Sequence, residues 1–268
     1  MPTKQVDGVT VNYHDVGSGE PIVLIHCSSS SHRQWRGLWE LLQDTHRVIA
    51  IDMLDWGDTD AWSNPEGSLF ADEVGLIHAI TSEFDAPLNI VGHSYGGAIA
   101  YYLAMTAPQK IKSLTLIEPM LGWILDSAND KKFYDEIRGV AETFWQKFEV
   151  SKAEEGINFY FDYWNGEGAW ESLDEGLAKY VFAGAEKNYH EFKAIFNGGT
   201  DLPGPETFLS PTLLMGGEQS NKPTLRILEI LETKFPDARK SLVPGAGHMS
   251  PITHSDQVNA IIEEFIRR

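Results

Sequence analysis

The segment Gly92–Gly96 reads Gly-His-Ser-Tyr-Gly and matches the pattern G-x-S-x-G. An apolar run, Leu88–Val91, precedes it, and an Ala-rich run, Ala98–Ala107, follows it. A strand, a sharp turn and a helix in this order expose the central serine at the strand's carboxyl end. The N-terminus of the helix supplies backbone N–H groups and the positive end of its dipole there. The pattern therefore predicts Ser94 as a nucleophile.

A serine hydroxyl is a weak nucleophile until a base takes its proton. Of the nine histidines, His248 stands directly after the last predicted strand, in the loop segment Pro244–Met249. That loop belongs to the same sheet edge as Ser94, so we predict His248 as the base. We expect the other histidines considered to have packing, structural or surface roles: His14, His26, His46, His78, His93, His190 and His254.

Strand and helix patterns alternate up to residue 118, which predicts a mostly parallel sheet covered on both faces. The strand-like runs are Val9–Tyr13, Pro21–His26, Arg47–Asp52, Leu88–Val91, Ile111–Ile117, Pro211–Met215 and Arg239–Val243. The helix-like runs between and after them are Trp35–Leu42, Asp72–Phe84, Ala98–Ala107 and Asp256–Ile266. Residues 121–205 show only helical patterns, at Lys131–Phe148, Glu154–Trp164 and Ser172–Asn188. We expect a core domain of residues 1–120 and 206–268, with 121–205 inserted as a helical cap.

The chain resembles the α/β-hydrolase fold superfamily, in the serine-nucleophile branch that carries a helical cap (carboxylesterase- or lactonase-like). The resemblance covers nearly all of residues 5–268 and rests on His26 to Trp35, Gly92–Gly97 and Gly245–His248. It implies an α/β fold whose mostly parallel sheet has eight strands, with helices on both faces and the cap inserted after the sixth strand.

The same resemblance implies an oxyanion hole made of two backbone N–H groups. By position, these belong to Ser28 and Tyr95, and one such donor contributes about 3–4 kcal/mol of transition-state stabilisation. Cys27 stands where the family usually has glycine. If the backbone needs a positive φ there, the Cβ atom costs about 1 kcal/mol. We expect Cys27 to be a small buried residue at the substrate pocket.

The carboxylate partner of His248 is not where most of this family carries it. An Asp usually follows the seventh strand, but Ser220 occupies that place and cannot stabilise an imidazolium by charge. Some branches place the acid after the sixth strand, where this chain has Glu118. We therefore predict Glu118 as the orienting acid. Glu218, two residues short of the usual position, is the alternative.

Aromatic residues are concentrated in the predicted cap. Residues 121–200 hold 17 of the chain's 30 Phe, Trp and Tyr residues. Core packing is the default role of such side chains, but this number exceeds what a thin helical layer needs. Some should line an apolar cleft above Ser94, where small ligands bind. The candidates for this pocket, besides Cys27, are Trp123, Trp145, Phe161 and Trp164.

Composition excludes several classes of partner and cofactor. The 21 basic and 39 acidic residues give a net charge of −18, which repels nucleic acids and anionic membranes. A single cysteine excludes an internal disulfide and a multi-cysteine metal site. The sequence contains no H-E-x-x-H, P-loop or G-x-G-x-x-G motif. We expect no metal, no cofactor, no signal peptide, a cytoplasmic location and a monomer or homodimer.

These residues predict a serine hydrolase that cleaves a neutral, largely apolar carboxylic ester through an acyl-enzyme intermediate. Lactone, thioester, amide and carbon–carbon bond hydrolysis and hydroxynitrile lyase chemistry remain open, because one fold hosts many reactions. Epoxide hydrolases and dehalogenases use an attacking Asp and do not fit Ser94. A binding protein that retains the pocket without turnover is the alternative from another class.

Overall fold

Eight strands form one sheet in the computed structural model, which describes residues 1–64 and 67–267. They are β1 (Thr3–Val6), β2 (Val9–Gly17), β3 (Glu20–Ile25), β4 (His46–Ile51), β5 (Leu88–His93), β6 (Ile111–Ile117), β7 (Thr212–Gly217) and β8 (Ala238–Val243). Their order is β1-β2-β4-β3-β5-β6-β7-β8. The pairs from β4 to β8 are parallel, and β2 pairs antiparallel with β1 and β4. The predicted α/β class and mostly parallel eight-stranded sheet are confirmed.

Side chains of the central strands alternate between two hydrophobic cores. In β3, Ile22 and Leu24 belong to one core, whereas Val23 and Ile25 belong to the other. A parallel strand covered on both faces must be apolar at every position. This explains why β3 is a continuous apolar run in the sequence.

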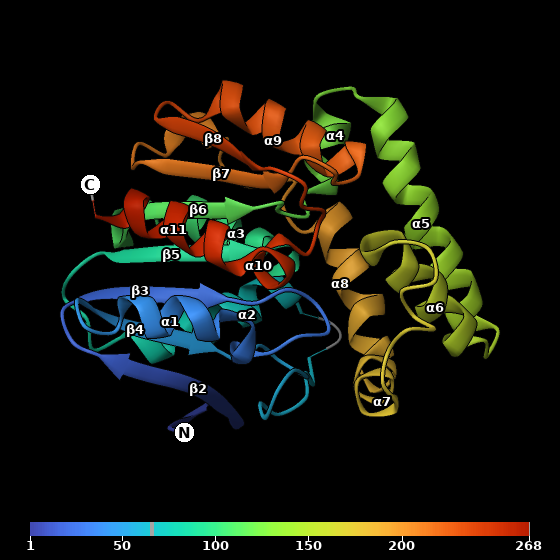
Figure 1. Cartoon of the computed structure of the whole chain (residues 1–268), viewed down its shortest axis with the longest axis horizontal. Coiled ribbons are helices and arrows are strands. Elements are labelled where there is room, and N and C mark those ends of the chain that lie inside the picture. The colour runs from blue at the N-terminus through green and yellow to red at the C-terminus, as the bar shows by residue number, and fades with distance from the viewer. Residues whose placement is uncertain (65–66, 268) are drawn as a thin grey trace.

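Helices cover both faces of this sheet (Figure 1). The core that contains Ile22 also receives α1 (Arg36–Leu42) and α11 (Ser255–Ile266). The opposite core receives α2 (Leu69–Thr81), α3 (Tyr95–Thr106) and α9 (Lys222–Lys234). Shorter helical segments are η1 (His32–Trp35), η2 (Pro108–Lys110), η3 (Pro205–Thr207) and α10 (Ser250–Thr253).

Five helices follow one another between β6 and β7 in the described part of the chain. They are α4 (Gly122–Ser127), α5 (Lys131–Glu149), α6 (Ala153–Asn165), α7 (Glu175–Ala183) and α8 (Ala185–Asn197). Figure 1 shows α5 to α8 to the right of the sheet, beyond the heads of the strand arrows. The expected helical cap after the sixth strand is therefore present, and it lies at the carboxyl edge of the sheet.

The single helix predicted over Ser172–Asn188 is wrong. The structure has two helices there, α7 and α8, and α8 extends to Asn197. Gly184 separates them, and a Cβ atom at this position would overlap the ring of Trp56. The close approach of the cap to the core therefore sets this boundary. The short helix α4 was not predicted either.

Among residues 1–64 and 67–267, no helix combines the length and the apolar character needed to cross a lipid bilayer.

Candidate active site

Ser94 lies on a strained turn between β5 and α3. Its φ and ψ are 56° and −119°, so its backbone has a positive φ that a non-glycine residue rarely adopts. The turn is compact: a Cβ atom on Gly92 would overlap the carbonyl oxygen of Gly96, and one on Gly96 would overlap that of His26. The N–H of Ser94 donates to the carbonyl oxygen of Ile117 on the neighbouring strand, at 2.9 Å. The sheet therefore holds the serine in this geometry.

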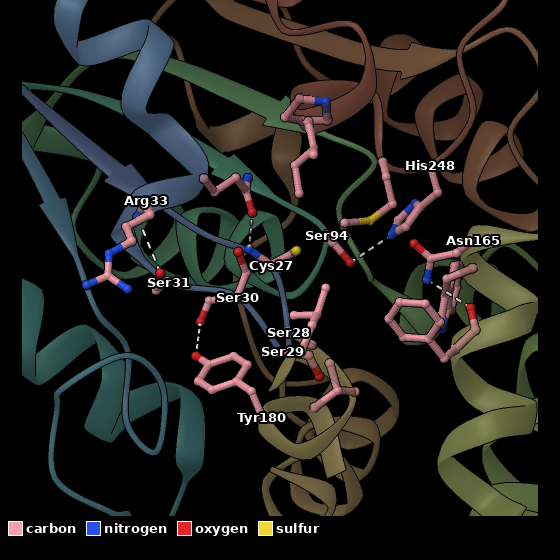
Figure 2. Close-up of a pocket in the computed structure, with 18 of the residues that line it drawn as sticks. Cys27, Ser28, Ser29, Ser30, Ser31, Arg33, Ser94, Asn165, Tyr180 and His248 are labelled. Carbon is pink, nitrogen blue, oxygen red and sulfur yellow. Dashed lines mark hydrogen bonds between the residues drawn. The ribbon is translucent and has the colours of Figure 1, made fainter. Parts of the chain in front are cut away.

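The structure brings Ser94, His248 and Glu118 into one hydrogen-bonded chain. The Ser94 hydroxyl donates to His248 Nε2 at 2.9 Å, as the dashed line in Figure 2 shows. His248 Nδ1 donates to Glu118 Oε2 at 2.6 Å. The three residues are 7%, 5% and 0% exposed, respectively. A hydroxyl, an imidazole and a carboxylate in this order constitute the arrangement that activates a serine.

Glu118 is held as a carboxylate at the end of β6. Its Oε1 accepts hydrogen bonds from the Gly217 N–H at 2.8 Å and from the Ser220 hydroxyl at 2.5 Å. Burial acts to raise the pKa of Glu118, but the charge of His248 and these hydrogen bonds outweigh it and lower the pKa. Glu218 is exposed, and its carboxylate accepts a long bond from the Gly245 N–H. The geometry favours Glu118 over Glu218.

Ser220 follows β7, where the family resemblance led us to look for an acid, and its hydroxyl donates to Glu118. Ser220 does not orient the imidazole itself but donates to the carboxylate that does.

His93 supports the backbone of His248 rather than only filling space. Burial lowers the pKa of His93 to about 3, so its ring stays neutral. Its Nε2 lies 2.9 Å from the His248 carbonyl oxygen, and its Nδ1 lies 3.2 Å from Gln34 Nε2. Gln34 Oε1 accepts from the Cys27 N–H at 3.1 Å. His93 thus links the loop after β3 to the loop of residues 244–249 that carries His248 (the histidine loop).

Cys27 is buried beside the pocket and has no positive φ. Among residues 1–64 and 67–267, the positive-φ residues other than glycine include Ser29, at 57°, but not Cys27. The left-handed turn of this loop therefore falls two residues later, and Cys27 avoids the expected strain. Burial raises the pKa of Cys27 to about 12, so its thiol stays protonated at neutral pH.

Two cavities meet at Ser94. The outer one, about 970 Å³, opens between the loop after β3, helices α6 and α7, and the histidine loop. Figure 2 shows Ser28–Ser31 on one side of this pocket and His248 on the other. The inner cavity is only about 20 Å³. Ser28 and Ser94 line both cavities, and Tyr95 lines the inner one.

The expected pocket residues divide into two groups. Phe161 and Cys27 line the outer cavity, and Trp164 lines both cavities with its ring 4.6 Å from that of His248. The assignment of Trp123 and Trp145 to the pocket is wrong, because they line neither cavity.

These two tryptophans serve the hydrophobic core instead. The ring of Trp123 packs against Phe70 and Tyr101 of the core domain. The ring of Trp145 packs edge-on against Tyr189 and other aromatic residues of α8. Packing between elements, which their sequence spacing does not reveal, directs both side chains away from Ser94.

Glu191 of α8 is a buried polar residue near the nucleophile that sequence reasoning missed. It accepts hydrogen bonds from the Ser28 hydroxyl and from Trp56 Nε1, the latter at 2.8 Å. Burial raises its pKa to about 7. The only signal in the sequence, Lys187 four residues earlier, is typical of an exposed helical ion pair.

Metal ligands do not gather in the described residues: no group of three or more His, Cys, Asp or Glu side chains there could hold a metal ion.

A family model for the alpha/beta hydrolase fold matches residues 20–255. The chain is 34% identical to the 2-hydroxy-6-oxo-2,4-heptadienoate hydrolase of Pseudomonas putida, over 41% of each chain. It is 24% identical to the dihydrolipoyllysine-residue acetyltransferase component of the acetoin cleaving system of Cupriavidus necator, over 97% of this chain and 67% of the relative.

The crystal structure of the enol-lactonase from Burkholderia xenovorans LB400 has a similar fold. Its TM-score is 0.77, at 19% identity and over the full length of both chains.

Proposed function

Since this chain belongs to the α/β-hydrolase fold family, we propose that it is a serine carboxylesterase that cleaves a neutral, largely apolar ester through an acyl-enzyme intermediate. Ser94 is the nucleophile, His248 the general base and Glu118 the acid that orients it. The observation that carries this proposal is the unbroken hydrogen-bonded chain from Ser94 through His248 to Glu118. It also favours an enzyme over a protein that only binds its ligand.

The proposed reaction has two halves. Ser94 Oγ attacks the ester carbonyl carbon while His248 Nε2 takes the hydroxyl proton, and Glu118 stabilises the imidazolium that forms. The oxyanion is stabilised by the N–H groups of Ser28 and Tyr95. His248 then gives its proton to the departing alkoxide oxygen. Water, activated by the same histidine, hydrolyses the acyl-enzyme and releases the carboxylic acid.

Hydrolysis of a lactone or of a carbon–carbon bond is the second candidate. It is supported by the relatives named above, which include a dienoate hydrolase and an enol-lactonase. Both reactions can start from the same activated serine, so the residues at the site do not separate them.

A fluorophosphonate probe and a substrate panel test the proposal. We expect the probe to label Ser94 within minutes and to leave the variant Ser94→Ala unlabelled. Short aryl esters, lactones and a dienoate ketone are then compared by kcat/KM. Turnover of the esters supports the carboxylesterase, whereas turnover of the lactones or the ketone alone supports the second candidate. An unlabelled Ser94 without any turnover refutes both.

A matched pair of variants tests the acid. Glu118→Gln leaves the imidazole without a carboxylate partner, and we expect kcat to fall by about 10³- to 10⁴-fold. Glu218→Gln changes an exposed residue and should keep kcat within about twofold. The opposite result would show that Glu218 is the acid.

A further inference from the structure

The inner cavity is a small chamber directly beside the nucleophile. At about 20 Å³ it has room for one or two water-sized groups. Its apolar wall includes Met120, Phe192 and Ile195. Two polar side chains of helix α8, Asn188 and Glu191, also line it. Besides Ser28, Ser94, Tyr95 and Tyr160, the chamber is therefore lined by two polar side chains from one helix.

Glu191 has hydrogen-bonding capacity that the protein does not use up. The residue is only 3% exposed. Each of its carboxyl oxygens has one hydrogen bond from the protein, from Trp56 Nε1 and from the Ser28 hydroxyl. A carboxylate oxygen accepts two such bonds, so both oxygens of the ionised group can take another donor.

Asn188 provides a second acceptor, and this one has no partner. The residue is 1% exposed, and its Nδ2 donates to the Ser29 hydroxyl at 3.0 Å. Its Oδ1 is buried and has no hydrogen-bond partner within residues 1–64 and 67–267. A buried acceptor left unpaired is costly, so a donor that reaches it from the chamber would be stabilised.

The position of His248 determines which part of an ester enters the inner chamber. The leaving alcohol must take its proton from His248, which lines the outer cavity and not the inner one. The alcohol therefore occupies the outer cavity. The acyl group, on the other side of the attacked carbon, extends into the inner chamber.

We propose that the inner chamber is a specificity subsite for a short acyl group that carries a hydroxyl on its α-carbon, whose single O–H is shared between the acceptors that Glu191 and Asn188 provide. This inference rests on the proposed esterase function. A glycolyl group is the smallest acyl group of this kind, because only one carbon and one oxygen lie beyond its carbonyl group. An ammonium group in the same place adds a positive charge where Lys187 already contributes one near Glu191.

Matched esters test the subsite. Phenyl glycolate and phenyl propanoate differ only in a terminal hydroxyl against a methyl group, and phenyl glycinate places an amino group there, which is partly protonated at pH 8. The value of kcat/KM is measured at pH 8, divided by each ester's rate constant with hydroxide, and expressed per Ser94 labelled by a fluorophosphonate. We expect the normalised ratio of glycolate to propanoate to be about 10 to 100.

Three variants assign that ratio to the two acceptors. Glu191→Gln replaces a charged acceptor by a neutral amide, and Asn188→Leu removes the acceptor Oδ1. Each substitution should lower the normalised ratio of glycolate to propanoate by about fivefold or more. Glu186→Gln changes an exposed carboxylate on the same helix and should leave the ratio unchanged.

The outcomes separate this inference from the function on which it rests. Equal normalised rates for glycolate and propanoate, or a ratio that both variants preserve, would refute the subsite and leave the esterase standing. Preference for the glycinate would refute hydroxyl recognition. If none of the esters reacts and Ser94 is not labelled, the esterase proposal fails and the subsite fails with it.

Discussion

Replacing Glu191 by Gln removes a carboxyl group that the fold holds where its negative charge is unfavourable. The side chain is 3% exposed and connects helix α8 of the cap to the loop after β3. Burial, the dominant cause, raises its pKa from 4.5 to about 7, although the nearby Lys187 and the hydrogen bonds from Ser28 and Trp56 act in the opposite direction. Gln has nearly the same shape and no charge at any pH.

The size and sign of the effect follow from the two pKa values. Below pH 4.5 the carboxyl is neutral in the folded and unfolded chains, so it contributes no difference. Between pH 4.5 and 7 the unfolded chain ionises first, and the folded state loses stability as pH rises. Above pH 7 the loss is complete at about 3 kcal/mol, since each tenfold change in an equilibrium constant is worth about 1.4 kcal/mol.

Urea unfolding at pH 5.5, 7 and 8.5 measures this effect. The free energy of unfolding of Glu191→Gln, minus that of the wild type, should increase by about 2 kcal/mol across this range, because part of the loss is already present at pH 5.5. The same difference for Glu186→Gln, an exposed carboxylate on the same helix, should stay flat. If the difference for Glu191→Gln is also independent of pH, the fold does not raise the pKa of this carboxyl group.

Three further substitutions have expected outcomes. Ser220→Ala removes a donor to Glu118 and should lower kcat about tenfold at unchanged KM, whereas Ser220→Thr should restore it. Lys187→Met leaves the buried Glu73 without its partner at 2.6 Å and should lower the free energy of unfolding at pH 8 by about 3–5 kcal/mol in urea. Trp164→Ala removes the ring packed on His248 and should lower kcat/KM for phenyl esters about tenfold, with Trp164→Phe intermediate; equal rates would contradict this contact.

The sheet was predictable because its information is local. A strand such as β3 is buried on both faces, so its sequence is apolar at consecutive positions and stands out without knowledge of its neighbours. The turn at Ser94 is local as well, because two glycines four residues apart are needed for the backbone to close around it. The position of Glu118 followed from the order of the strands, since β6 lies beside both β5 and β7.

The interior of the cap could not be predicted, because contacts distant in sequence determine it. Glu191 lies four residues after Lys187, a spacing that usually indicates a solvent-exposed ion pair. In the structure Lys187 instead contacts Glu73 of α2, and Glu191 contacts Trp56 and Ser28. The direction of an aromatic ring such as Trp145 is likewise set by the helix opposite it.

Helix α8 both attaches the cap to the core and lines the inner chamber. Lys187 forms the buried ion pair with α2, Asn188 reaches the loop after β3, and Glu191 contacts both that loop and Trp56. Two of these three side chains also line the inner cavity. Any movement that lifts α8 from the core must therefore break the ion pair and dismantle the proposed recognition site together. It follows that substitutions at 188 or 191 that change acyl specificity also change how firmly the cap is held, so specificity and stability should be measured on the same variants.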